Sequence, residues 1–105
     1  MIEGFVYDER LDIHVPMLER PFDEYELDKR LAMIAYWEEV RGRIPTKVMM
    51  LEQSIEHKLN EMSEETDFER SCRLNGEIAE LASQINDLLI WYRTVQEEPS
   101  VKRHM

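Results

Sequence analysis

Residues 71–95 read SCRLNGEIAELASQINDLLIWYRTV and carry the strongest periodic pattern in the chain. Eight positions recur there at alternating intervals of three and four residues, without interruption. They are Ser71, Leu74, Ile78, Leu81, Ile85, Leu88, Tyr92 and Val95. This heptad spacing is typical of a helix that packs lengthwise against another helix. The sequence therefore predicts a long helix over 67–96.

A second heptad pattern lies just before it and predicts a helix over 46–64. Its apolar positions are Val48, Leu51, Ile55, Leu59 and Met62. The short connection between the two helices forces them to run antiparallel. We identify a capping box at this connection, in which Thr66 caps the next helix and Glu69 reaches back to it. The two helices are predicted to form a long antiparallel coiled-coil hairpin.

A further helix is expected over 22–43, with Pro21 suited to its first turn. Apolar side chains form two adjoining rows along it, so its buried face should be broad. The rows are Leu27, Leu31 and Ile34, and Met33, Trp37, Val40 and Ile44. Gly42 and Pro45 are expected to end this helix, because glycine is flexible and proline clashes with the preceding turn.

The first 20 residues differ from the rest, since β-prone and polar side chains partly alternate there. A small β-hairpin and an extended arm both fit this pattern. An isolated two-stranded hairpin is barely stable, so the segment must lie against another part of the protein. The predicted fold class is all-α, with three helices and a short extended or β-hairpin N-terminal arm. One domain is expected over 1–98, followed by a flexible tail over 99–105.

Composition excludes several classes of protein. The formal net charge of −10 argues against direct nucleic-acid binding, which requires a basic surface. The longest apolar run, 31–37, is far shorter than the roughly 20 residues of a membrane-spanning helix. No secretory signal is recognised at the N-terminus. Cys72 is the single cysteine and cannot form an internal disulfide, so we expect a reduced, cytoplasmic protein without a cofactor.

Helix lengths predict which part of the hairpin needs a cover. The helix over 67–96 is longer than the one over 46–64, so its end should overhang. This end contains five consecutive apolar residues, 88–92, which point in all directions around a helix. The helix over 22–43 and a second copy of the protein are both candidate covers. We therefore expect Leu88, Trp91 and Tyr92 to take part in contacts, and the protein to form a homodimer.

Residues 67–78, DFERSCRLNGEI, resemble the UVR motif. That family is a short helical hairpin found in excision-repair B and C subunits and in regulators of the Clp protease system. The Asp-Phe-Glu helix start, two small residues and the following basic residue and leucine carry the resemblance, which covers about 51–85. The chain departs from the family at Asn75-Gly76, where the family commonly has Arg-Asp, and at Met62, where it usually has Ala.

The resemblance implies contact between helical hairpins as the job of this segment. The residues that it implicates in the contact are Leu59, Met62, Phe68, Cys72, Leu74 and Ile78. Another helical-hairpin protein is a second possible partner, and an adaptor role in repair or proteolysis would follow from the family alone.

Histidine and carboxylate side chains are the candidates for a metal site in this sequence. The histidines His14, His57 and His104 lie far apart, and no Glu-x-x-His pair of the di-iron kind is present. The carboxylate pairs Glu61/Glu64 and Glu77/Glu80 each share a helical face and could hold a magnesium ion.

A magnesium site made by such carboxylate pairs is typical of small all-α nucleotide pyrophosphatases of the MazG-like family. Their second carboxylate motif is missing here, since Gln84 stands three residues before Asp87. Trp37, Trp91 and Tyr92 could stack on a ligand, but buried structural aromatic residues are commoner. Cys72 could sense oxidants, but a buried small side chain is the commoner role. The sequence thus favours a non-catalytic protein–protein interaction module, with a magnesium-dependent nucleotide hydrolase as the alternative.

Overall fold

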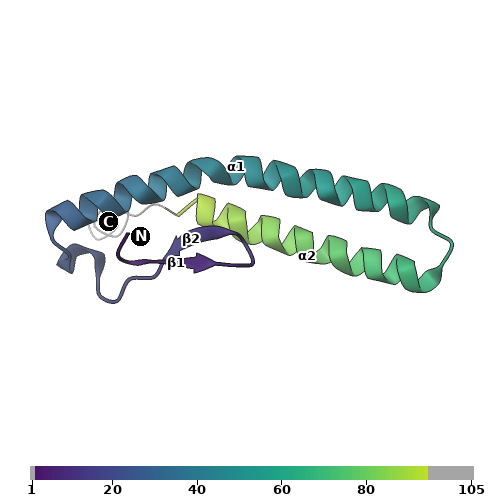
Figure 1. Cartoon of the computed structure of the whole chain (residues 1–105), viewed down its shortest axis with the longest axis horizontal. Coiled ribbons are helices and arrows are strands. Elements are labelled where there is room, and N and C mark those ends of the chain that lie inside the picture. Colours follow the sequence, from purple (N-terminus) through teal and green to yellow (C-terminus); the bar gives the residue numbers. More distant parts are fainter. Residues whose placement is uncertain (1, 95–105) are drawn as a thin grey trace, which may run out of the picture.

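The computed structural model describes residues 2–94, which form a molecule 59 Å long (Figure 1). The elements in chain order are β1 (Phe5–Asp8), β2 (Ile13–Pro16), the 3-10 turn η1 (Phe22–Glu24), α1 (Leu27–Glu64) and α2 (Phe68–Tyr92). The two helices pack antiparallel as a hairpin, and the two strands form a small antiparallel sheet beside its open end. Residues 2–94 are therefore mainly helical, with two α-helices.

The prediction of three helices is wrong, because the helices expected over 22–43 and 46–64 are one continuous helix, α1. Gly42 and Pro45 lie inside it and do not end it. A proline in a helix interior costs about 3 kcal/mol, because it removes one hydrogen bond and crowds the preceding turn. One apolar row nevertheless runs through this point, from Ile44 to Val48, and both residues belong to the hydrophobic core or pack against it. This burial offsets the local cost.

Helix α2 begins one residue later than predicted and without the expected capping box. Asp67 is the residue that precedes it, and the side chain of Asp67 makes no capping hydrogen bond. Instead, the carboxylate of Glu65 accepts a hydrogen bond of 3.0 Å from the backbone N–H of Asp67. The helix ends at Tyr92, whereas Val95 and the tail predicted over 99–105 lie outside the described residues. Within residues 2–94 no helix is long and apolar enough to cross a membrane.

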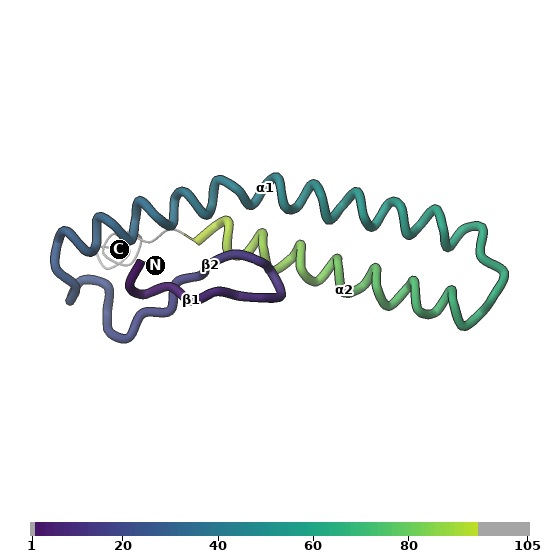
Figure 2. Tube along the Cα trace, in the orientation of Figure 1, coloured from purple at the N-terminus to yellow at the C-terminus, as the bar shows by residue number. Residues whose placement is uncertain are grey.

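Of the two conformations expected for the N-terminal segment, the structure has the β-hairpin. Its register pairs Val6 with Val15, and Asp12 in the connecting turn adopts a φ of 57°. The turn is held by a hydrogen bond of 2.7 Å from the N–H of Asp12 to the carbonyl of Asp8. The hairpin lies beneath the first half of α1 and beside the end of α2 (Figure 2).

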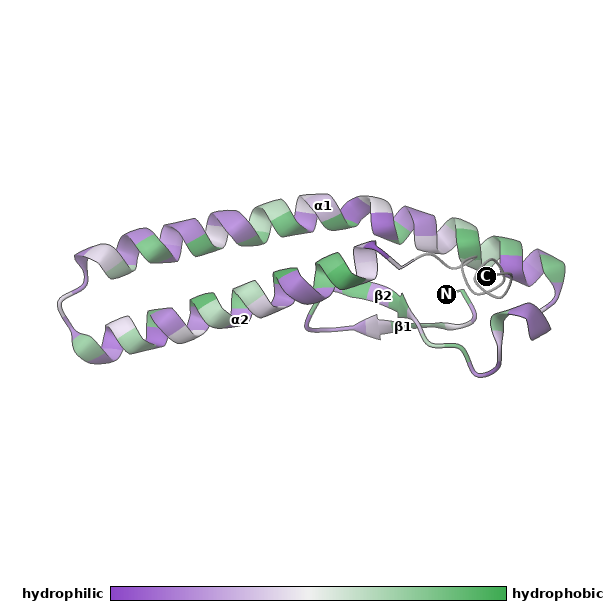
Figure 3. Cartoon of the chain, turned by 180° about the vertical axis from the view of Figure 1, so that it is seen from behind, coloured by the Kyte–Doolittle hydropathy of each residue, from purple (hydrophilic) through white to green (hydrophobic). Residues whose placement is uncertain are grey.

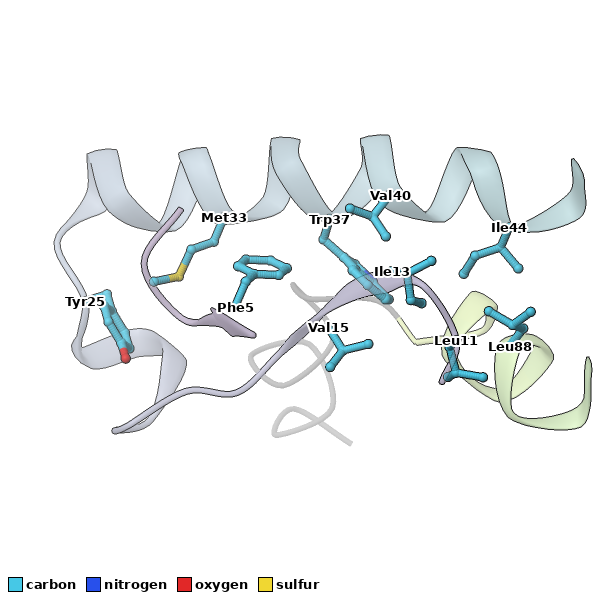
Figure 4. Packing of buried hydrophobic residues seen from close by; sticks show 10 residues of the cluster. All are labelled: Phe5, Leu11, Ile13, Val15, Tyr25, Met33, Trp37, Val40, Ile44 and Leu88. Atoms are coloured by element: carbon cyan, nitrogen blue, oxygen red, sulfur yellow. The ribbon is translucent and has the colours of Figure 1, made fainter. Parts of the chain in front are cut away.

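The hydrophobic core lies where the hairpin, α1 and α2 meet (Figure 4). Its buried members are Phe5, Leu11, Ile13, Val15, Tyr25, Met33, Trp37, Val40, Ile44 and Leu88. Only Leu88 comes from α2, so the core is mainly a contact between the β-hairpin and the first half of α1. The rows predicted along 22–43 are confirmed in one case, because Met33, Trp37, Val40 and Ile44 are buried while Leu27 and Leu31 are exposed.

Trp37 lies at the centre of this core and is fully buried. Its indole N–H donates a hydrogen bond of 2.7 Å to the carbonyl of Thr94, and its ring packs edge-on against Trp91 at 5.7 Å. The ring of Phe5 lies 6.3 Å away on the other side. Trp37 therefore joins the hairpin, α1 and the segment after α2, as expected for a structural aromatic side chain with a satisfied donor.

Two glycines should respond in opposite directions to substitution by alanine. Gly76→Ala should raise the free energy of unfolding by about 0.5–1 kcal/mol, because no atom lies within 4 Å of the added Cβ. Gly4→Ala should lower it by more than about 1 kcal/mol, because Gly4 has a φ of +90° and its Cβ would lie 2.8 Å from Leu18 Cδ2. Urea unfolding followed by circular dichroism measures both. Equal effects of the two substitutions would contradict this assignment of backbone conformation.

Candidate functional site

The part of the α1–α2 hairpin that projects away from the β-hairpin is the least covered region of the protein. We call residues 49–86 the arm; it consists of two helices and their connection, and the turn of the β-hairpin contacts its base through Arg10 (Figure 1). Leu74 is the only buried residue between positions 49 and 86. A two-helix arrangement of this kind leaves the apolar face of each helix partly open to water.

The apolar seam predicted for the two helices runs along the inside of the arm (Figure 3). Most of its members are half-buried, namely Leu51, Ile55, Met62, Ile78, Leu81 and Ile85. Two helices touch along one line, so a groove borders the seam on each side. The seam therefore has two edges, and the chemistry of these edges differs.

Ion pairs between the helices lie along one edge, which we call the paired edge. Lys58 Nζ lies 2.9 Å from Glu77 Oε1. Nearer the tip, Arg70 contacts Glu61 at 3.2 Å and Glu65 at 2.7 Å. Lys58 lowers the pKa of Glu77 by hydrogen bonding and by its charge. The pKa of Glu65 is lowered chiefly by the N–H of Asp67, and then by Arg70.

The opposite edge, which we call the open edge, has no ion pair between α1 and α2 anywhere in residues 2–94. Successive helical residues are turned by about 100°, so Leu59 lies across the seam from Lys58. The same geometry places a set of uncharged α2 residues on this side, namely Ser71, Asn75, Ile78, Ala82, Ile85 and Leu89. Leu59 and Leu89 are 47% and 38% exposed, so this edge presents apolar surface to water.

The turn of the β-hairpin is tied to the paired edge of α2 by Arg10. Its Nε lies 2.9 Å from Glu80, Nη1 lies 2.7 Å from Asp87, and Nη2 donates a hydrogen bond of 2.6 Å to Ser83 Oγ. Hydrogen bonds to Asp87 and Glu80 raise the pKa of Arg10. The pKa of Glu80 is lowered by hydrogen bonds from Gln84 and Arg10. One side chain thus fixes the hairpin turn relative to α2.

The residues predicted for contact near the tip have very different exposures. Phe68, at the start of α2, is 79% exposed, and Leu59 is also exposed. Met62 and Ile78 are half-buried, whereas Leu74 is buried between the helices. They are accompanied by Cys72, which was expected to be a buried small side chain; that expectation is wrong, because Cys72 is exposed.

The apolar end of α2 is covered in part by the chain itself, while Leu89 and Ile90 stay exposed. Leu88 is buried in the core, and Trp91 is half-buried against Trp37. Tyr92 stays partly exposed, with the guanidinium of Arg41 4.9 Å above its ring centroid. Two candidates were expected to cover this end, α1 and a second copy of the protein. For Leu88 and Trp91 the structure shows α1, together with the β-hairpin.

The carboxylates considered for magnesium are mostly engaged in ion pairs. Glu61 pairs with Arg70, Glu77 with Lys58, and Glu80 with the hairpin turn. Among residues 2–94, no group of three or more acidic, histidine or cysteine side chains is placed to hold a metal ion. These carboxylates provide electrostatic contact between elements of the fold.

Comparisons of the chain with protein-family models, with characterised proteins and with solved structures find no match. Sequence reasoning missed Arg10 and Lys47, because their partners lie 70 to 77 residues and 35 residues away along the chain. No local motif signals such pairs.

The lowered carboxylate pKa values give stability a definite pH dependence. Glu80 has a folded pKa below its ordinary 4.5, so its contribution is present at neutral pH and is lost as the pH falls below that value. Between about pH 6 and pH 3 the free energy of unfolding should therefore fall less in the Arg10→Gln variant than in the wild type. Arg73→Gln removes one positive charge from an exposed position of α2, where it makes no ion pair within residues 2–94 and is the smallest of the causes that lower the pKa of Glu77. Its pH dependence should therefore stay much closer to that of the wild type. Urea midpoints across the pH series measure this.

Proposed function

We propose that the protein is a non-catalytic protein–protein interaction module that self-associates through the open edge of its arm. The observation that carries this proposal is the arm itself, in which two helices of 49–86 bury only Leu74. Apolar seams with this much exposure are characteristic of surfaces that bind a partner. Two copies packed together would turn the half-open seams into the interior of a four-helix arrangement.

The open edge of α2 is complementary to itself. Its six positions step by four and three residues and are symmetric about residue 80. In an antiparallel, two-fold pairing of α2 with its copy, Ile78 would lie opposite Ala82, Ile85 opposite Asn75, and Leu89 opposite Ser71. Each larger apolar side chain would then meet a smaller one, which allows close approach of the helices.

Charge supports this edge over the other one. The six open-edge positions of α2 hold no charged side chain, so pairing them would bury no unpaired ion. The paired edge carries Lys58, Glu77 and Arg70, and the hairpin turn blocks part of it through Arg10. A second copy on that edge would have to displace these ion pairs. The exposed Leu59 lies beside the proposed contact and would extend it onto α1.

Ala82→Arg should convert the dimer to a monomer. Ala82 is exposed in the single chain, so an arginine there fits the isolated fold but prevents the close approach of a second α2. Light scattering on a sizing column should give twice 12.7 kDa for the wild type and 12.7 kDa for the variant. Ala32→Arg, the same change at an exposed position of α1 outside the arm, is the matched control and should remain dimeric.

A wild-type protein that stays at 12.7 kDa over the whole concentration series would contradict self-association. A dimer that Ala82→Arg leaves intact would place the interface elsewhere. Release of phosphate or pyrophosphate from nucleoside triphosphates with magnesium would contradict the non-catalytic assignment and favour the hydrolase alternative.

A further inference from the structure

A cavity of about 580 Å³ lies on the paired edge, between the turn of the β-hairpin and the two helices. Its apolar lining consists of Leu11 from the turn, Met50 and Leu51 from α1, and Leu88 from α2. This volume is within the range of pockets that hold small organic ligands, and an apolar wall is their usual feature. The proposed dimer contact, on the other edge of the seam, does not use these residues.

The polar lining of this cavity is basic, although the chain is strongly acidic. Arg10, Lys47, His57 and Lys58 all line it, and Asp12 is the one acidic residue among its twelve lining residues. The whole chain has 23 acidic and 13 basic side chains. The lining therefore holds an excess of basic side chains, while Glu77, Glu80 and Asp87, which pair with Lys58 and Arg10, lie outside it. It offers an anionic ligand local N–H donors rather than a net positive charge.

The two lysines have donors to spare for a ligand. Lys47 Nζ lies 3.1 Å from Asp12 Oδ2, and Lys58 Nζ lies 2.9 Å from Glu77 Oε1. An ammonium group has three N–H donors, so one carboxylate partner leaves two of them for a second acceptor. Each ion pair also holds its lysine at the wall of the cavity, which reduces the entropy lost when a ligand binds.

A smaller cavity of about 230 Å³ adjoins the first and shares Asp12 and Lys47 with it. It adds His14, Arg43 and the hydroxyl-bearing Tyr7. Tyr7 donates a hydrogen bond to Asp12, which holds that carboxylate in place between the two cavities. The ion pair of Lys47 and Asp12 is therefore the shared wall, with cationic side chains on both sides of it.

We propose that the larger cavity binds an amphipathic anion, with an apolar body against Leu11, Met50 and Leu88 and a carboxylate at Lys58. Lys47 and Lys58 are eleven residues apart on α1, about 16 Å along the helix, so a ligand whose body lies at Met50 and Leu88 directs its head toward Lys58. The apolar wall supplies the affinity for the body of the ligand, and the ammonium group of Lys58 supplies charge-assisted hydrogen bonds to its head. A medium-chain fatty acid has this chemistry and is small enough for the cavity.

Isothermal titration with decanoate, below its micelle concentration, tests the proposal on the full chain. Decanoate should bind, and decan-1-ol, which has the same apolar body without the charge, should bind about tenfold more weakly or worse. Acetate should not bind, because it lacks the apolar body. Lys58→Gln should weaken decanoate binding about tenfold, whereas Lys47→Gln, beside the apolar body of the ligand, should weaken it less. Met50→Gln should also weaken decanoate binding. Because Met50 is exposed, this substitution should leave the fold intact.

Arg73→Gln is the matched control, since it removes a cation from exposed α2 surface outside the cavity and should leave the affinity unchanged. Circular dichroism melting of each variant confirms that it folds. No binding of decanoate, equal binding of decan-1-ol, or a wild-type affinity in the Lys58→Gln variant would each overturn the proposal. The oligomeric state, measured in parallel, reports on the proposed function separately.

Discussion

The unequal length of the two helices is the constraint on which the rest of the structure depends. α1 has 38 residues and α2 has 25, so α1 extends about 20 Å past its partner. A helix with a broad apolar face cannot leave that length bare. The β-hairpin covers it, and Trp37 lies at the point where hairpin, α1 and the end of α2 meet. A hairpin too small to be stable alone thus gains its stability from the overhang.

The same constraint explains why the two edges of the seam differ. The hairpin turn reaches the helices on one side only, where Arg10 holds it against Glu80 and Asp87. That side therefore collects the cations and carboxylates that connect the elements, and it encloses a cavity between them. The other side is left with uncharged α2 positions. The packing of the β-hairpin on one side of the helices thus accounts for the difference between the paired edge and the open edge.

The sequence predicted the parts of the fold that depend on local periodicity. The heptads of α1 and α2 predicted an antiparallel hairpin, and it is present. The break expected at Pro45 is absent, because a local cost of about 3 kcal/mol is outweighed by an apolar row that continues through it. The same error affected the expected helix lengths. The sequence predicted that the second helix of the hairpin would extend past the first, whereas α1 extends past α2. The basic cavity could not be foreseen, since Arg10, Lys47 and Leu88 come from distant segments.

The separation of the two edges bears on how the proposed contacts relate to each other. A dimer formed through Ile78, Ala82 and Ile85 would leave the cavity wall at Lys47 and Lys58 facing solvent in both copies. Ligand binding and self-association would then be structurally compatible, and coupling between them would have to pass through the seam. Leu51 is the residue placed to carry it, since it lines the cavity and also packs between the helices. A ligand that shifts Leu51 would alter the packing of α1 against α2, and through it the surface offered to the second copy.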